Sequence, residues 1–357
     1  MEEKKEQYGL KWLTPGFFVT GWPKFFELEK NILPIWLLII LSFGVLQDES
    51  TRETVAWMAL VVIMRRVIVG GLCLSTKRLD GQTVLITGAN TGIGRETALD
   101  LSARGAKIIM GCRDTKKAEK VAQEIKNQTG GDVDVFSLDL SSLNSVREFA
   151  KEVKSRHSRI HMLINNAGIM ATPKSTTEDG HDITMCTNHL GPFLLTCLLL
   201  PLLHHSEPGR IISIASMEHW RGKIHLDNFN FSKGPYNRMN VYASSKLANM
   251  LFARQLAQEL KGTNIQAFSV HPGATQSELA RSLPIPLSTI WAKGSHLFIK
   301  STTEGAQTTI YCATEASQDP LIHFADCTVG NPSPQARDDA LALKVWELSE
   351  TLVGLSK

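Results

Sequence analysis

A tyrosine and a lysine, Tyr242 and Lys246, lie four residues apart in a helical pattern and therefore share one helix face. A phenol has an ordinary pKa of roughly 10, which is too high for easy proton transfer near neutrality. A neighbouring ammonium favours the phenolate and lowers that pKa. The pair therefore predicts a proton donor or acceptor for an alcohol or carbonyl oxygen. Because a lone tyrosine at this spacing is more often a packing aromatic, the interpretation depends on the motifs around it.

A glycine-rich turn, TGANTGIG over residues 87–94, follows a short β-branched run and precedes a helical pattern. Glycines in such a turn let the backbone bend tightly and approach a pyrophosphate at a helix N-terminus. The spacing is TGxxxGxG rather than GxGxxG, but the position between a strand and a helix is the context that a nucleotide site requires. The predicted dinucleotide-binding residues of this turn are Gly88, Asn90, Thr91, Gly92, Ile93 and Gly94.

The elements that would position these residues alternate between strand and helix patterns from about residue 81 onward. Strand patterns cover 83–88, 106–111, 133–140, 160–168, 210–216 and 265–273; helix patterns cover 93–104, 115–127, 143–156, 186–204 and 242–260. Such alternation implies right-handed βαβ units and a mostly parallel sheet with helices on both faces. The predicted fold is α/β, a Rossmann-type doubly wound parallel sheet with an N-terminal helical membrane anchor. The predicted division is an anchor region, 1–80, and a catalytic domain, 81–357.

Several motifs occur along this domain in a fixed order. They are TGANTGIG, Asp139-Leu140, Asn165-Asn166-Ala167-Gly168, Tyr242-Ala-Ser-Ser-Lys246 and Pro272-Gly273. In this order they resemble the short-chain dehydrogenase/reductase superfamily, over about residue 81 to the C-terminus. Less specific motifs resemble the membrane-anchored retinol dehydrogenase branch of this superfamily. They are NNAGIM, NHLGPFLLT, YASSKLAN, HPGATQSEL, EGAQT and FADC.

The resemblance implies roles for four residues. Tyr242 would donate a proton to a carbonyl oxygen during reduction, or accept one during oxidation, and Lys246 would also hold the nicotinamide ribose hydroxyls. Ser216 resembles the serine that hydrogen-bonds the reacting oxygen, and Asn188 the helix asparagine that holds a water in the proton relay. Ser216 lies 26 residues before Tyr242, which is longer than the commonest family interval. Ser213 on the same strand is the competing candidate, although the sheet would bury it.

The residues after the second strand, Gly111-Cys112-Arg113-Asp114, indicate the cofactor preference. Family members that prefer NAD carry an acidic residue there, which hydrogen-bonds the adenine ribose. Arg113 could instead form a charge-assisted fork with a 2′-phosphate, and we interpret Asp114 as the N-cap of the next helix. The predicted cofactor is therefore NADP(H), with a solvated surface charge as the alternative for Arg113.

The resemblance also implies cofactor contacts farther along the chain. Asp139 would meet the adenine amino group, and Asn166 would line the ribose side of the cofactor. Thr275 and Ser277 would approach the nicotinamide amide and the phosphates. The remaining predicted contacts belong to the same motifs: Leu140, Ala167, Gly168, Pro272 and Gly273.

The stretch 283–300, LPIPLSTIWAKGSHLFIK, lies where the family places its substrate lid. Its apolar and aromatic residues suit a lipophilic alcohol or aldehyde drawn from a membrane, although an ordinary surface helix would show the same pattern. Retinol and retinal are the predicted substrate type. Two alternatives stay open: a steroid or other lipid carbonyl reductase, and a non-catalytic dinucleotide-binding membrane scaffold. His271, His296 and His323 show no metal-ligand spacing, so no metal site is predicted.

The composition limits the class of partner. Apolar residues make up 43% of the 357 residues and charged residues 20%, which is ordinary for a globular chain. The net charge of +3 and the lack of a dense Lys/Arg run argue against a nucleic-acid partner. Six scattered cysteines without a CxxC pair favour reduced thiols. A homo-oligomer is left open.

The first 80 residues differ from the rest. Residues 31–47 carry no charge over 17 positions, and as a helix would span about 26 Å, near the lower limit for crossing a bilayer. A second, shorter run covers 54–64 and ends at Arg65 and Arg66, and aromatic residues typical of a membrane interface precede both runs. A membrane anchor is predicted, with a buried helical hairpin as the alternative. One crossing and a two-helix hairpin both stay open.

The charges around the two runs predict the orientation. Basic residues lie on both outer flanks and the intervening loop is net acidic, which fits a hairpin with both ends in the cytosol. The predicted location is therefore a membrane, that of the endoplasmic reticulum, with the catalytic domain facing the cytosol. Two sequons, at Asn127 and Asn230, would stay without glycan in that orientation.

Overall fold

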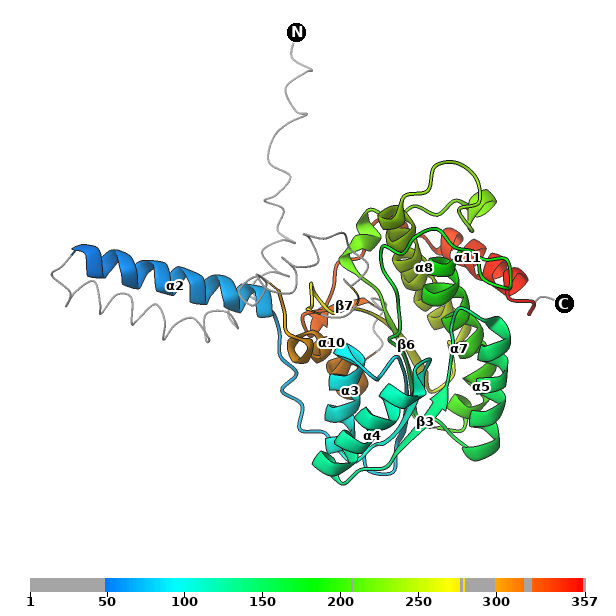
Figure 1. The fold of residues 1–357 in the computed structure, drawn as a ribbon, viewed down its shortest axis with the longest axis horizontal. Coiled ribbons are helices and arrows are strands. Elements are labelled where there is room, and N and C mark those ends of the chain that lie inside the picture. The colour runs from blue at the N-terminus through cyan, green and yellow to red at the C-terminus, as the bar shows by residue number, and fades with distance from the viewer. Residues whose placement is uncertain (1–48, 207, 277–278, 280–298, 318–322, 356–357) are drawn as a thin grey trace, which may run out of the picture. The chain divides into compact units, whose positions relative to one another are not determined.

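The computed structural model describes residues 49–206, 208–276, 279, 299–317 and 323–355 (Figure 1). The chain divides into two compact units, Met1–Ile68 and Val69–Lys357. All six cysteines are free thiols. The division at residues 80 and 81 stays a prediction, but hydrogen bonds already attach the segment before β1 to the second unit. The Leu79 amide donates to the Arg104 carbonyl at 2.8 Å, and the Cys73 amide to Gln307 Oε1 at 3.0 Å.

An eight-stranded sheet forms the centre of the second unit, in the order β3-β2-β1-β4-β5-β6-β7-β8. The first seven strands run parallel, and β8 pairs antiparallel with β7. Their bounds are β1 Thr83–Thr87, β2 Lys107–Cys112, β3 Val133–Ser137, β4 Met162–Asn165, β5 Gly209–Ile214, β6 Ile265–His271, β7 His323–Ala325 and β8 Thr328–Val329. The predicted Rossmann-type parallel sheet is thereby confirmed. The strand order reverses between β1 and β4, the point at which such sheets bind ligands.

Helices cover both faces of the sheet (Figure 1). On one face lie α3 Gly92–Ala103, α4 Thr115–Thr129 and α10 Thr302–Thr314; on the other lie α5 Leu143–Arg156, α7 Gly191–His204, α8 Arg238–Glu259 and α11 Asp339–Leu352. Each face has its own cluster of buried apolar side chains. Because both faces are covered, the central strands are nearly continuous apolar runs, as β1 (TVLIT) illustrates.

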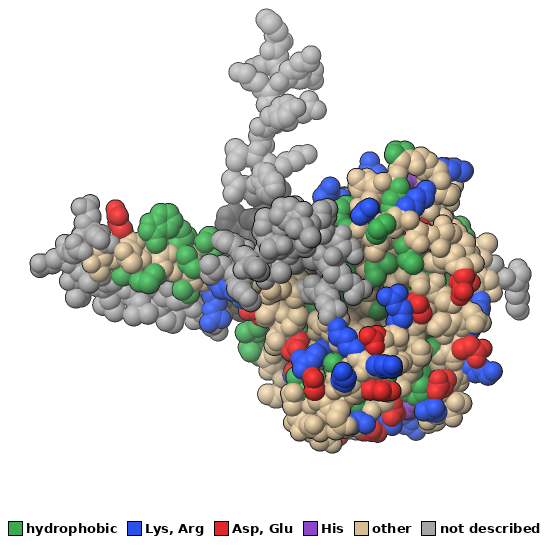
Figure 2. Space-filling view, in the orientation of Figure 1, with side chains coloured by type: hydrophobic (Ala, Val, Ile, Leu, Met, Phe, Trp, Pro, Cys, Tyr) green, Lys and Arg blue, Asp and Glu red, His purple; other side chains and the backbone are tan. Residues whose placement is uncertain are grey.

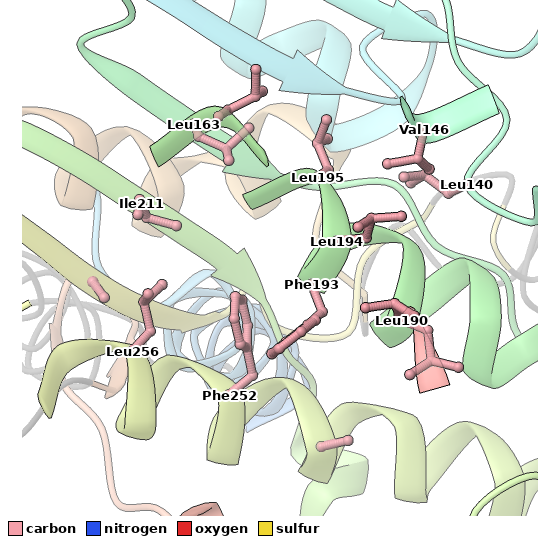
Figure 3. Close-up of a cluster of buried hydrophobic side chains, with 14 of the residues drawn as sticks. Leu140, Val146, Leu163, Leu190, Phe193, Leu194, Leu195, Ile211, Phe252 and Leu256 are labelled. Atoms are coloured by element: carbon pink, nitrogen blue, oxygen red, sulfur yellow. The ribbon is translucent and has the colours of Figure 1, made fainter. Parts of the chain in front are cut away.

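The larger cluster fixes α7 and α8 against the sheet (Figure 3). Phe193 of α7 lies edge-on to Phe252 of α8, with ring centroids 5.4 Å apart. Leu256 and Ile211 extend the same cluster toward the strands. Aromatic pairs in this geometry add about 0.5–1.5 kcal/mol to the free energy of area burial. The packing therefore holds α8, which carries Tyr242 and Lys246, in one position.

The chain is helical over the predicted 186–204, but its first turn is wound as a π-helix. The structure has a short helix α6, Ile183–Met185, then a π-helical turn η1, Cys186–Leu190, and only then α7. Pro192 lies at the start of α7, where proline is tolerated. Nothing in the apolar pattern distinguishes a π turn from an α turn, since both place side chains on nearly the same face. Wider turns of this type occur often at functional sites, and η1 contains Asn188.

The described part of the first unit is one helix, α2 Glu49–Val69. It contains the second apolar run, and its Trp57, Met58 and Val67 side chains are 57–65% exposed (Figure 2). The first apolar run, 31–47, lies outside the described residues, so the anchor helix stays a prediction. Within the described ranges, only Ile183–His204 is long and apolar enough to cross a membrane, and 72% of its apolar window is buried. That burial is typical of a core helix.

Candidate active site

The serine, tyrosine and lysine predicted from sequence meet at the carboxyl end of β5. Tyr242 and Lys246 project from α8 and are each 3% exposed, and Ser216 follows β5 by two residues. The Ser216 side chain hydrogen-bonds the Tyr242 side chain. Lys246 Nζ lies 5.7 Å from the centroid of the Tyr242 ring and donates to the Ile214 carbonyl at 3.0 Å. The group has the geometry of a proton donor next to a fixed cation.

Burial dominates the electrostatics of this group. It raises the pKa of Tyr242 to about 12, against a lowering by the Ser216 hydrogen bond and a further rise from the Glu218 charge. Burial also lowers the pKa of Lys246 to about 8. The sequence-based expectation that Lys246 lowers the pKa of Tyr242 is therefore not met in this structure. The group that lowers it is Ser216.

Ser216 has an extended backbone, with φ −161° and ψ 158°, and its Oγ accepts from the Glu218 amide at 3.3 Å. It thereby caps a 3₁₀ turn, η2 Met217–Trp220. The competing candidate, Ser213, lies within β5 between Asn165 of β4 and Ser269 of β6, and is buried. The geometry therefore favours Ser216 as the residue that contacts the reacting oxygen.

Asn188, in the π turn, uses its side chain to hold the chain after β4. Its Oδ1 accepts from the Ile169 amide at 2.8 Å, and its Nδ2 donates to the Ile169 carbonyl and to Ser245 Oγ, both at 2.9 Å. A β-carbon at Gly168 would lie 3.4 Å from Lys246 Nζ. Asn188 thus fixes the backbone directly beside the lysine, while its role in holding a relay water stays a prediction.

The glycine-rich turn leaves the start of α3 open. The N-cap residue, Thr91, makes no side-chain hydrogen bond to the helix, whereas Asp114 caps α4 and Ser301 caps α10. Gly88 has φ +65°, and a β-carbon at Gly94 would lie 2.6 Å from the Gly88 carbonyl oxygen. The free amides and the positive end of the helix dipole suit a phosphate. The residues of this turn therefore fit the pyrophosphate of a dinucleotide. Asn90, Thr91, Gly92 and Ile93 are partly exposed along it.

Thr87 and Asn166 join this turn to the end of β4. Thr87 Oγ1 accepts from the Asn166 and Ala167 amides, both at 3.0 Å, and Asn166 Nδ2 donates to the Thr87 carbonyl at 2.8 Å. Asn166 is thus placed as a clamp between strands, and its contact with a ribose stays a prediction. Sequence reasoning did not assign a role to Thr87, although it is the first residue of the motif.

Two further polar residues of α8 were missed. Ser245 receives the Asn188 hydrogen bond, and Asn249 Nδ2 donates to the Ile214 carbonyl at 3.3 Å. The signal that could have found them is helical spacing, since residues 242, 245, 246 and 249 share one face. The predicted catalytic pair is therefore part of a longer polar stripe on a helix that is otherwise packed in the core.

The residues predicted to bind the adenosine lie after β2 and β3. Arg113 follows β2 and is exposed, and no ion pair or hydrogen bond engages it among the residues described. Asp114 Oδ1 accepts from the Lys117 amide at 2.9 Å, which confirms its predicted N-cap role. Asp139 Oδ1 accepts from the Ser141 amide at 2.9 Å, while Leu140 is buried in the core. Arg113 is therefore free to meet a phosphate, whereas Asp114 Oδ1 already accepts the N-cap hydrogen bond of α4.

The Pro272-Gly273 turn follows β6, and Gly273 has φ +85°. Thr275 is buried and its Oγ1 lies 3.3 Å from the Gly273 carbonyl. Lys300 packs its methylene groups against Gly273 and pairs with Asp326 at 2.7 Å. Ser277 and almost all of 283–300 lie outside the described residues. Where the chain is described, no group of three or more His, Cys, Asp or Glu could hold a metal ion.

An open helix N-terminus, together with a Ser–Tyr–Lys group at the carboxyl end of β5, defines a dinucleotide-dependent oxidoreductase of the Rossmann type. A family model described as short chain dehydrogenase matches residues 82–286. The chain belongs to the short-chain dehydrogenase/reductase family, and it is an NAD(P)-dependent oxidoreductase acting on CH–OH groups.

Individual relatives agree with this assignment. Human retinol dehydrogenase 11 is 45% identical over 295 residues, which cover 82% of this chain and 92% of that protein. A Mycobacterium paratuberculosis protein of solved structure is 35% identical, with a TM-score of 0.67, covering 80% of this chain and 98% of its own. The complex of Pseudomonas aeruginosa RhlG with NADP is 27% identical, with a TM-score of 0.54, covering 66% and 91%. The predicted resemblance to the retinol dehydrogenase branch is thereby confirmed.

Proposed function

We propose that this chain interconverts a lipophilic alcohol of the retinol type and its aldehyde with NADP(H), at a membrane. The observation that carries the proposal is the Ser216–Tyr242–Lys246 group at the carboxyl edge of the sheet. A relative of 45% identity named a retinol dehydrogenase supports the substrate class.

Tyr242, Ser216 and Lys246 would each have a separate role in the reaction. A bound nicotinamide would supply or accept the hydride. Tyr242 is protonated near neutrality because its pKa is raised, so it carries the proton that a carbonyl oxygen takes up during reduction. Ser216 hydrogen-bonds the same hydroxyl and would orient the substrate oxygen. Lys246 has its ammonium 5.7 Å from the centroid of the tyrosine ring and would hold the nicotinamide ribose hydroxyls, the other role that the family resemblance implies.

The NADP(H) preference is supported by Arg113. It is exposed and unpaired among the described residues, and it directly follows β2, where the adenine ribose is bound in dinucleotide folds. The nearby carboxylate of Asp114 is occupied by the Lys117 amide. A guanidinium without a competing carboxylate suits a 2′-phosphate better than a 2′-hydroxyl. The complex of RhlG with NADP gives a precedent within the family.

The membrane location is supported by the apolar run at 31–47 and by the exposed apolar side chains of α2. A lipophilic substrate dissolves in the bilayer, so an enzyme attached there meets it at high local concentration. We place the catalytic domain on the cytosolic side, where its six thiols stay reduced.

A substrate panel tests the activity. The purified chain is assayed in detergent with retinal, a steroid ketone and a long-chain aldehyde, each with NADPH and with NADH. Turnover of retinal with NADPH supports the proposal, and Tyr242→Phe should lower kcat by about 10²–10⁴-fold while retaining NADPH binding. Preference for the steroid ketone would instead indicate a steroid or other lipid carbonyl reductase. No turnover with any carbonyl would favour the non-catalytic scaffold.

A charge variant tests the cofactor. Arg113→Ala should weaken NADPH binding by about 10- to 100-fold and NADH binding little, because only NADPH has the 2′-phosphate. The matched control is Lys120→Ala, which removes an exposed charge of the same sign from α4. Equal weakening of both cofactors, or the same effect from the control, contradicts the assignment.

Sealed microsomes test the location. Protease added from outside should digest the catalytic domain, and Asn127, exposed on α4, should carry no glycan. A glycan there, or full protection from protease, would place the domain in the lumen. Release by alkaline carbonate would contradict the anchor.

A further inference from the structure

His219 is a buried imidazole under the turn that carries Ser216. Its side chain is 2% exposed, and it is the one buried residue of η2. The neighbouring Met217 and Trp220 are 56% and 54% exposed. The turn that holds the reacting serine is therefore attached to the interior through His219.

Both ring nitrogens of His219 have partners. Nδ1 lies 2.6 Å from the Ser216 carbonyl oxygen, and Nε2 lies 3.1 Å from the Ser333 amide nitrogen. A backbone amide can only donate, so Nε2 accepts, and a neutral ring must then carry its proton on Nδ1. Nδ1–H therefore donates to Ser216. Because both nitrogens are committed to the backbone, His219 is not placed to exchange protons with a substrate.

The hydrogen bond acts directly on the conformation of Ser216. The Ser216 carbonyl accepts from the His219 ring and, at 3.1 Å, from the His219 amide. Two donors from one residue fix the peptide plane after Ser216, and with it the extended ψ of 158°. That plane determines where the Ser216 hydroxyl lies relative to Tyr242.

The groups on the other side of the His219 ring, away from Ser216, are also held in place. Ser333 is buried, and its Oγ accepts from the Ala336 amide at 3.4 Å. The His219 ring lies edge-on to His323 of β7, with centroids 5.6 Å apart, and His323 Nδ1 lies 3.0 Å from Ser269 Oγ of β6. The imidazole is therefore held between the edge of the sheet and the segment after β8.

We propose that His219 is a positioning residue for the reaction: by donating from Nδ1 to the Ser216 carbonyl, it holds the Ser216 hydroxyl in place beside Tyr242. This inference rests on the proposed function, which gives Ser216 its contact with the substrate oxygen. It adds a residue that lies outside the Ser–Tyr–Lys group and whose two ring nitrogens both contact the backbone.

Two substitutions separate the two hydrogen bonds. In His219→Asn, the amide nitrogen occupies the position of Nδ1 and can still donate to Ser216, but the Ser333 contact is lost. In His219→Gln, the longer side chain reaches the Ser333 amide with its carbonyl oxygen, while the donor to Ser216 is lost. A purely structural role would make both variants lose activity in proportion to their lost stability.

The test measures kcat per NADPH-binding site for retinal reduction, together with the KM for NADPH and the melting temperature. We expect kcat to fall by about 10- to 100-fold in His219→Gln, with the KM for NADPH unchanged, because small displacements of a reacting group have effects of this size. His219→Asn should stay within a few fold of the parent even where it melts lower. If the Gln variant binds no NADPH, His219→Phe replaces it, since it also lacks the donor.

The outcomes are distinguishable. Equal kcat in the parent and in the Gln or Phe variant overturns the inference, as does a loss in the Asn variant as large as that in the Gln variant. An inactive parent chain would instead refute the proposed function and leave no reaction for His219 to serve.

Discussion

Lys246 is a buried cation that has no acidic partner among the residues that the structure describes. It is 3% exposed, and its ammonium donates to the Ile214 carbonyl, which also accepts from Asn249. Burying a charge costs free energy, because the charged form loses its hydration, and this loss lowers the pKa of the lysine. A strained or costly residue of this type is typical of active sites. The burial of the charged lysine therefore opposes folding.

Removal of that charge should stabilise the protein. Lys246→Met keeps the volume and leaves Asn249 on the Ile214 carbonyl, so the free energy of unfolding at pH 7 should rise by about 1–3 kcal/mol. Activity should be lost. Since the folded pKa of about 8 lies below the ordinary 10.5, the unfolded chain binds more protons between these values. The destabilisation is therefore complete below pH 8 and is relieved as the pH rises.

Urea titrations at pH 7, 8, 9 and 9.5 check this. The difference between the Met variant and the parent should shrink with rising pH. A Met variant that is less stable than the parent at pH 7 would contradict the assignment of Lys246 as an uncompensated charge.

At the first βα turn, the end of β1 and the chain after β4 are held together by close backbone contact rather than by packing of large side chains. A β-carbon at Gly88 would lie 2.9 Å from the Ala167 β-carbon, and one at Gly94 would collide with the Asn166 amide nitrogen and the Gly88 carbonyl oxygen. The free amides at the start of α3 depend on that path of the backbone. The element therefore tolerates little change, although it is partly exposed.

Gly94→Ala should damage this element. The new β-carbon would collide with the Asn166 amide nitrogen and lie 2.6 Å from the Gly88 carbonyl oxygen, so the backbone must shift. We expect NADPH affinity to fall at least about tenfold, because the phosphate amides move with it. Fluorescence titration measures the affinity. The control is Gly130→Ala, at the end of α4, where φ is +70° but nothing lies within 4 Å of the new carbon.

The control should lower the melting temperature without changing the NADPH affinity. An unchanged affinity in Gly94→Ala would show that the turn does not contact the phosphates as proposed.

The α/β unit depends as a whole on histidines that are buried in the neutral form. Burial lowers the pKa of His189 and of His271 to about 4, and that of His323 to about 3. His189 lies between α8 and α11, where its Nε2 is 2.8 Å from Ser349 Oγ. His271 and His323 belong to adjacent strands at the β6–β7 end of the sheet. Their protonation therefore opposes packing on both sides of the molecule.

Stability should fall steeply on acidification. The folded pKa values lie below the ordinary 6.5, so the unfolded chain binds more protons between about pH 4 and 6.5. The stability contribution is complete above pH 6.5 and is lost as the pH falls below it. Each histidine changes the free energy of unfolding by about 1.4 kcal/mol per pH unit in that window, and the three together change it by up to about 4 kcal/mol per pH unit. Urea titrations at pH 7, 6, 5.5 and 5 measure the slope.

His189→Phe should flatten that slope by about one proton. A free energy of unfolding that stays constant between pH 6.5 and 5 in the parent would contradict the burial of these rings as neutral groups.

The local features of this protein could be predicted from its sequence. The helix over 143–156, the Asp114 cap and the parallel sheet follow from periodicity and capping, which act between residues close in the chain. The pairing of Tyr242 with Lys246 on one face follows from helical spacing in the same way. Ordered motifs placed the predicted catalytic serine after β5 without showing what holds it there.

Only the tertiary structure decided the features that depend on burial and on distant contacts. The pKa of Tyr242 rises rather than falls because the packed core, not the neighbouring lysine, dominates its environment. The π turn at 186–190 places Asn188 against Ile169 and Ser245, which are remote in sequence. His219 meets Ser333 across 114 positions of the chain. No local pattern encodes such a contact, because its free energy exists only once the sheet has brought both segments together.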